Sequence, residues 1–203
     1  MAVKVLGIVG SYRRGGTIDQ AVSEVLAGAA EAGAGVEKIY LLDRHVEFCT
    51  NCRRCTQLPG PGPGPCIHQD AMAGLIAAIE SADALVVGAP VNSGGVNALT
   101  QRFIERLVGF VYWPWGQPAP KLRRAGRPRK VAVLVTSSAM PAFMARLTTG
   151  AMRTLKQAAK VVGARPAATL YAGQAAVAER PVLDRRLVRR ARRAGRRLAR
   201  MGA

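Results

Sequence analysis

Residues 3–17, VKVLGIVGSYRRGGT, join a short apolar run to a glycine-rich loop and indicate the fold. Residues 3–9 end at Gly10 and are typical of a strand that is buried in a parallel sheet. The loop SYRRGG follows, and residues 17–33 then carry apolar side chains at helical spacing. A strand, a glycine-rich turn and a helix in this order predict the first unit of an α/β domain.

The same alternation continues along the whole chain. Strands are predicted at 3–9, 36–42, 84–89, 130–135 and 167–171. Helices are predicted at 17–33, 70–81, 96–108, 144–163 and 184–201. Because each strand is followed by a helix, we expect one doubly wound, five-stranded parallel sheet with helices on both faces.

We expect residues 1–203 to form a single domain with two insertions, a cysteine-rich loop at 44–69 and an aromatic and basic connection at 109–128. A proline and glycine tract at 59–65 lies inside the first insertion and does not mark a domain boundary. Ligands of such sheets bind outside the carboxyl ends of the strands. The site residues are therefore expected in the loops 10–18, 43–70, 90–97 and 136–146.

The formal net charge of +18 comes mainly from arginines, which gather at 121–130 and in the tail at 184–201. The tail predicts an amphipathic helix with an arginine-covered outer face. Neither segment carries interleaved aromatic residues or a nucleic-acid-binding module, so we expect no specific nucleic-acid partner. Because no apolar run is long enough to span a membrane and no signal peptide is evident, we expect a cytoplasmic protein.

Gly10–Thr17 is a candidate phosphate-binding loop. Glycines allow a tight turn, and the amides at the start of the following helix point towards an anion. Ser11 and Thr17 add hydroxyl donors, and Arg13 adds a positive charge suited to phosphate. The loop matches neither the dinucleotide-binding nor the Walker pattern. An ordinary glycine turn with surface arginines remains an equal alternative for this loop taken alone.

The pattern G-S-x-R-x-x-G/S-T after the first strand resembles the NAD(P)H-dependent FMN reductases. The resemblance continues through residues 83–106, DALVVGAPVNSGGVNALTQRFIER, and covers essentially the whole chain. Phe103–Arg106 matches the family's F-[IL]-D-R ending, with Glu105 in place of aspartate. The resemblance implies a flavodoxin-like fold with strand order 2-1-3-4-5.

The resemblance also implies a set of FMN-binding residues. Ser11, Arg13, Thr17 and the backbone amide of Ile18 would hold the phosphate, although the family often has threonine at position 18. The ring would contact two loops, of which the first has asparagine where the family usually has tyrosine, at position 92. These ring-facing residues are Pro90, Val91, Asn92, Gly94, Thr136, Ser137 and Ser138. Plain helix caps are the alternative for both loops.

Four aromatic residues fall within six positions of the 109–128 connection: Phe110, Tyr112, Trp113 and Trp115. Such a cluster is usual at an interface or in a packed lid. The family commonly forms dimers or tetramers with the flavin near a subunit boundary. We therefore expect a homodimer or homotetramer in which this segment packs at that boundary. A loop packed on its own domain is an equal alternative.

Cys49, Cys52, Cys55 and Cys66 are the only cysteines, and their C-x-x-C-x-x-C spacing suits a metal or cluster. The motif resembles that of the iron–sulfur flavoprotein branch of the family, which implies a candidate [4Fe–4S] cluster. The ten-residue gap before Cys66 is longer than the branch's usual gap. Zinc, with His45 or His68 as substitute ligands, and free or substrate-reactive thiols remain the alternatives.

The resemblance therefore implies an enzyme, an FMN-dependent NAD(P)H oxidoreductase. It would pass electrons from a reduced nicotinamide through FMN to a small acceptor such as a quinone or a free flavin. No catalytic side chain is expected, because the flavin carries the chemistry. The alternatives are an iron–sulfur flavoprotein or a non-enzymatic flavodoxin-like electron carrier that donates to a protein partner.

Overall fold

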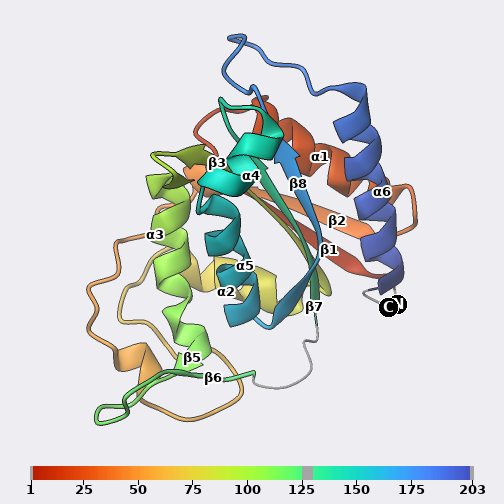
Figure 1. Cartoon of the computed structure of the whole chain (residues 1–203). Helices are drawn as coiled ribbons and strands as arrows, with labels where there is room; N and C mark the ends of the chain where they lie inside the picture. Colours follow the sequence, from red (N-terminus) through yellow and green to blue (C-terminus); the bar gives the residue numbers. More distant parts are fainter. Residues whose placement is uncertain (1, 125–129, 202–203) are drawn as a thin grey trace.

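The structure, a computed structural model, describes residues 2–124 and 130–201. Its centre is a parallel sheet with the strand order β2-β1-β3-β7-β8 (Figure 1). These strands are β1 (Lys4–Val9), β2 (Gly35–Tyr40), β3 (Ala84–Asn92), β7 (Lys130–Ser137) and β8 (Ala164–Ala172). They correspond to the five predicted strands in the order 2-1-3-4-5, so the predicted flavodoxin-like sheet is confirmed.

Helices cover both faces of the sheet. On one face, α1 (Thr17–Ala30) and α6 (Arg185–Met201) lie side by side (Figure 1). On the other face are α2 (Met72–Ser81), α3 (Ala98–Arg106) and α5 (Ala151–Val161). The side chains of β1 alternate between the two cores: Val5 packs with α1 and α6, whereas Leu6 packs with α2, α3 and α5. Each core therefore draws on the same buried strands.

Several predicted boundaries differ from the structure; for example, the strand predicted at 36–42 ends at Tyr40, and β3 continues to Asn92. The helix predicted at 144–163 is two helices, α4 (Ala142–Thr148) and α5, because two β-branched threonines and Gly150 weaken helix formation between them. The Gly150 amide instead donates to the Gly94 carbonyl at 2.7 Å. The helix predicted at 96–108 is α3 followed by a 3₁₀ turn at Leu107–Phe110. The last strand begins at Ala164, three residues before its predicted start.

Short elements that the sequence did not predict complete the fold. A two-residue strand, β4 (Gly95–Val96), pairs antiparallel with the end of β3. The 109–128 connection contains a hairpin of β5 (Val111–Tyr112) and β6 (Lys121–Leu122), and its residues 125–128 lie outside the described part. Two 3₁₀ turns lie in this region: Leu41–Asp43 precedes the cysteine-rich loop at 44–69, called the cysteine segment below, and Arg54–Thr56 lies inside it.

Helix α6 packs closely on α1 because two glycines leave room for backbone contact. A Cβ atom at Gly28 would lie 2.2 Å from the Arg192 carbonyl oxygen, and one at Gly195 would lie 1.9 Å from the Val25 carbonyl oxygen. The outer edge of this contact is closed by ion pairs of Arg192 with Glu24 and Glu31. The arginine-rich tail is therefore a packed helix, as predicted, and part of its charge is paired. Across the described residues, every helix is too short or too polar to cross a membrane.

Candidate functional site

The loops that follow β1, β3, β7 and β8 meet around a cavity of about 380 Å³ at the carboxyl ends of the strands. β1 and β3 are neighbours in the sheet, so the cavity lies at the point where the strand order reverses. Nine of the eleven residues predicted to contact FMN line it: Ser11, Arg13, Thr17, Ile18, Pro90, Val91, Asn92, Ser137 and Ser138.

The loop after β1 has the features of an anion site. No side chain caps the start of α1 at Gly16, so within the described chain its first-turn amides are open to an anionic ligand. Ser11 and Thr17 are buried beside these amides, and Arg13 reaches the same cavity. The Arg13 amide donates to Ser11 Oγ at 3.1 Å, which fixes the loop next to the hydroxyl.

Asp19 holds the same loop from inside the helix. Its carboxylate accepts from the Gly15 amide at 2.7 Å and from Lys38 and Tyr40. Burial alone would raise the pKa of Asp19, but these hydrogen bonds and the Lys38 charge outweigh it and keep the pKa below its ordinary value. Asp19 therefore carries its charge at neutral pH and positions the loop, in which Gly15 has a positive φ of 68°.

Gly94 and Thr136, the remaining two predicted contacts, do not line the cavity. Gly94 lies in the turn between β3 and β4 at a φ of 80°, where its carbonyl accepts from Gly150. Thr136 is only 1% exposed, and its hydroxyl has no hydrogen-bond partner among the described residues. The predicted loops therefore meet at one cavity, but two of the eleven predicted contacts lie away from it.

Asn92 lines the cavity and does not cap a helix. The helix after β3 begins at Ala98, and its cap is Asn97, whose side chain accepts from the Thr100 amide at 3.1 Å. The alternative in which Asn92 is a helix cap is therefore wrong. Ser138 does not cap a helix either: the N-cap of α4 is Pro141, which makes no side-chain cap bond, and Ser138 Oγ accepts from the Met140 amide at 3.1 Å in the loop before it.

Five lining residues were missing from the sequence prediction: Tyr12, Gly16, Ala139, Ala175 and Ala176. Tyr12 and Gly16 lie in the loop that was singled out, but nothing in the spacing distinguishes them. Ala175 and Ala176 belong to the segment 173–184, which follows β8. Because ligands bind at the carboxyl ends of the strands, the segment after the last strand could also have been predicted to line the site, but the predicted loops did not include it.

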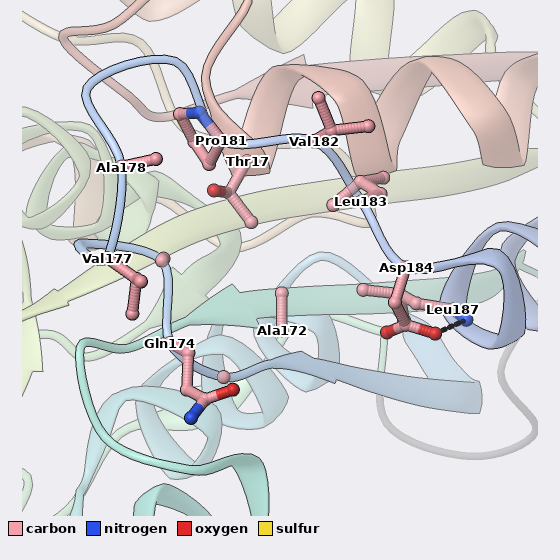
Figure 2. Close-up of a pocket in the computed structure, with 12 residues that line it drawn as sticks. Thr17, Ala172, Gln174, Val177, Ala178, Pro181, Val182, Leu183, Asp184 and Leu187 are labelled. Atoms are coloured by element: carbon pink, nitrogen blue, oxygen red, sulfur yellow. Dashed lines mark hydrogen bonds between the residues drawn. The ribbon is translucent and has the colours of Figure 1, made fainter.

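The segment 173–184 covers the outer side of the phosphate loop. Arg13 donates to the Glu179 carbonyl, and the side chain of Gln20 donates to the Pro181 carbonyl at 2.6 Å. A second cavity of about 330 Å³ lies between this segment, the end of β8 and the start of α6 (Figure 2). Thr17 and Ala175 line both cavities, so the two spaces adjoin at the start of α1.

The four cysteines are free thiols in unlike surroundings. Cys55 is buried, Cys49 is half-buried, and Cys52 and Cys66 are exposed. Burial raises the pKa of Cys55, and the other three cysteines raise it further. Among the described residues, no three histidines, cysteines or carboxylates converge on one metal-ion position. A zinc ion would require thiolates about 3.8 Å apart, given its ~2.3 Å zinc–sulfur bonds.

Arg106 holds both ends of the cysteine segment. Its guanidinium donates to the Glu47 carbonyl at 2.7 Å, to Asp70 at 2.6 Å and to Cys66 Sγ at 3.4 Å. Burial opposes the charge of Asp70, but bonds from Arg106 and two backbone amides lower its pKa to about 2. Arg106 ends α3, and the Leu99 amide near the start of α3 bonds Tyr12 of the cavity lining, so α3, about 13 Å long at ~1.5 Å per residue, separates Arg106 from that cavity.

The aromatic connection packs on the cysteine segment of its own chain. The Arg53 guanidinium lies between the rings of Trp113 and Trp115, 4.1 Å from each ring centre. Arg53 also donates to the Trp113 carbonyl at 2.6 Å. This arrangement is the predicted alternative in which the loop packs on its own domain. Trp115 stays 67% exposed, so the prediction of a subunit boundary at this segment is still open to test.

The family profile described as NADPH-dependent FMN reductase matches residues 3–180, which include every loop around the cavity. The chain belongs to this family. The match confirms the resemblance to the FMN reductases that the glycine-rich loop indicated, and it extends over residues 3–180.

Two curated relatives are iron–sulfur flavoproteins. The one from Archaeoglobus fulgidus is 27% identical over 135 residues, which cover 64% of this chain and 59% of that protein. The one from Methanocaldococcus jannaschii is 33% identical over 104 residues, 51% of each chain. This member of the FMN reductase family thus spans between half and three-fifths of the length of these relatives.

Among solved structures, an NAD(P)H:quinone oxidoreductase from Methanothermobacter marburgensis superposes with a TM-score of 0.67. It is 19% identical, and the match covers 98% of this chain and all of that one. At this identity the likeness shows the flavodoxin-like fold alone.

Proposed function

We propose that this protein is an FMN-dependent NAD(P)H oxidoreductase. The observation that carries the proposal is the meeting of three predicted loops around one cavity, with Ser11, Arg13 and Thr17 at the uncapped start of α1. Membership of the NADPH-dependent FMN reductase family supports it. The proposal treats the described chain as a single FMN-binding domain.

The residues present suit FMN at both ends of the cavity. The phosphate would bind the α1 amides, the hydroxyls of Ser11 and Thr17, and Arg13. The ring would lie against Pro90–Asn92 and Ser137–Ser138, whose backbone supplies polar contacts. FMN, when bound, accepts a hydride from a reduced nicotinamide and passes electrons on. The protein binds and orients it, and we assign no side chain as acid or base.

The electron acceptor is proposed to be a small oxidant such as a quinone or a free flavin. The structural neighbour described as an NAD(P)H:quinone oxidoreductase supports this class of acceptor. We also propose a homodimer or homotetramer in the cytoplasm. The assembly is supported by exposed apolar surface that a second copy could cover, at Trp115 and at Phe143 and Leu147 of α4.

Replacing Arg13 with alanine is expected to weaken FMN binding about tenfold or more, because a hydrogen bond to a charged group contributes ~1.5–3 kcal/mol. Arg14→Ala is the matched control, since Arg14 pairs with Asp43 and stacks on Tyr40, outside the cavity lining. Titration of apoprotein with FMN measures both. Equal losses in the two variants would contradict the assigned phosphate site.

Turnover is tested on the purified protein loaded with FMN. Addition of NADPH or NADH without oxygen should bleach the flavin absorbance, and a quinone should restore it. A protein that binds no FMN would contradict both the reductase and the flavin-carrier alternatives. A protein that binds FMN and is not reduced by either nicotinamide would favour the non-enzymatic electron carrier.

A second candidate function is that of an iron–sulfur flavoprotein, with Cys49, Cys52, Cys55 and Cys66 as ligands. Two observations favour it: the curated relatives carry that description, and the other three cysteines raise the pKa of Cys55, while Arg106 donates to Cys66. No three of these side chains converge on one metal-ion position among the described residues, and a cluster does not require that, because each thiolate binds a different iron atom.

Anaerobic purification followed by iron, sulfide and zinc analysis tests this candidate. A cluster predicts about four irons and four sulfides per chain, with broad visible absorbance that Cys52→Ala removes. Zinc without sulfide would favour the metal-ion alternative. A metal-free protein would favour free or substrate-reactive thiols.

A further inference from the structure

Tyr12 is the aromatic residue among those that line the larger cavity. It lies between Ser11 and Arg13 in the phosphate loop, and its side chain is 49% exposed. Its hydroxyl accepts a hydrogen bond from the Leu99 amide at 3.1 Å, at the start of α3. The ring is therefore held in place at its far end although half of its surface is open.

The position where an aromatic residue was expected is occupied by a polar one. Asn92 lines the same cavity at the end of β3, and its side chain is exposed. A flat, largely apolar ring such as isoalloxazine would gain little from that amide. The cavity thus has one polar and one aromatic candidate on the loops that would meet the ring.

Three other aromatic residues of the chain are engaged in contacts outside the cavity. Tyr40 carries Arg14 and Lys38 on its ring and bonds Asp19 through its hydroxyl. Trp113 and Trp115 enclose Arg53. Of these residues, Tyr12 alone lines the cavity.

We propose that Tyr12 stacks on or against the isoalloxazine of bound FMN and replaces the aromatic contact that Asn92 lacks. The inference rests on the proposed function, in which the cavity binds FMN. Aromatic rings in contact gain affinity beyond the area they bury. Because the hydrogen bond to Leu99 already fixes the ring, little conformational entropy is lost on binding.

Fluorescence of bound FMN tests the contact directly, because a phenol ring touching an excited flavin donates an electron and quenches its emission. Tyr12→Leu is expected to raise the emission of bound FMN severalfold and to weaken binding about three- to tenfold. Tyr12→Phe keeps a ring but is a poor electron donor. It should raise the emission and leave the affinity within about twofold, since the stacked area is retained. Tyr12→Trp should stay quenched.

Tyr112→Leu is the matched control from the aromatic connection. Tyr112 lies on β5, outside the cavity lining, and is expected to leave FMN emission and affinity unchanged. If Tyr112→Leu raised the emission and Tyr12→Leu did not, the proposal would be overturned in favour of a ring covered by the connection of a second copy. Unchanged emission in both variants would also overturn it. If the wild-type protein bound no FMN, the proposed function itself would fail, which is a separate result.

Discussion

Replacing Arg106 with methionine is expected to lower the free energy of unfolding by about 3–5 kcal/mol, the usual cost of breaking a buried ion pair. The side chains of Arg106 and Asp70 are each only 2% exposed. Without the guanidinium, the Asp70 carboxylate stays buried with its charge uncompensated. The Glu47 carbonyl and Cys66 also lose their donor. Urea denaturation at pH 7 measures the loss.

The double variant Arg106→Met/Asp70→Asn should be less destabilised than Arg106→Met, because it removes the stranded charge. Arg14→Ala is the matched surface control: its pair with Asp43 is exposed, and such pairs contribute at most about 1 kcal/mol. If Arg106→Met were no more harmful than Arg14→Ala, the buried pair would not hold the cysteine segment.

The pH dependence of wild-type stability follows from the same pair. The pKa of Asp70 falls from its ordinary 3.8 to about 2 in the folded chain. A lowered pKa means that the unfolded chain binds the proton first, so this contribution is present above pH ~4 and is lost as the pH falls towards ~2. The Asp70→Asn variant should show a flatter stability curve across that window.

The fold could be predicted from the sequence because buried parallel strands are short apolar runs, as at Val86 and Val133. The strand order came from the family resemblance, since periodicity does not order strands. The break at Gly150 was missed because the local threonines and glycine only weaken a helix, and the bond to Gly94 that accompanies the break lies 56 positions earlier in the chain. The β5–β6 hairpin was missed because two-residue strands leave no pattern.

The sequence predicts which loops meet at the cavity better than which residues line it. Strand ends determine which loops meet, and this follows from topology. Which residues line the cavity depends on contacts between loops: Gly94 lies in the β3–β4 turn and bonds Gly150, and Tyr12 is held by its hydrogen bond with the Leu99 amide. Likewise, the spacing of the cysteines predicts a shared neighbourhood but not that Cys55 is buried while Cys66 meets Arg106.

Replacing Gly10 with alanine is expected to weaken FMN binding by about 10- to 100-fold, because the phosphate would lose one or two charge-assisted hydrogen bonds. A Cβ atom at Gly10 would lie 2.1 Å from Thr100 Oγ1 and 3.1 Å from the Gly88 carbonyl oxygen. The Thr100 hydroxyl is buried, 3.0 Å from the Gly10 carbonyl oxygen and 2.6 Å from Asn97 Oδ1. The added methyl group would therefore push the phosphate loop away from α3.

The double variant Gly10→Ala/Thr100→Ala separates this clash from other effects of the alanine. Removal of Thr100 Oγ1 removes the shortest clash, while the contacts of the new methyl group with Thr100 Cβ at 3.2 Å and with the Gly88 carbonyl oxygen at 3.1 Å remain, so part of the FMN affinity should return. Thr100→Ala alone loses one buried hydrogen bond at the α3 cap, with an expected stability loss of about 1 kcal/mol and a smaller effect on FMN. If the double variant bound FMN as weakly as Gly10→Ala, the close approach at Thr100 would not be what sets the loop. Recovery would instead show that the phosphate loop and the start of α3 are one fitted unit. The segment between β3 and α3, which would face the flavin ring, would then be positioned by the Gly10–Thr100 contact that also positions the phosphate loop.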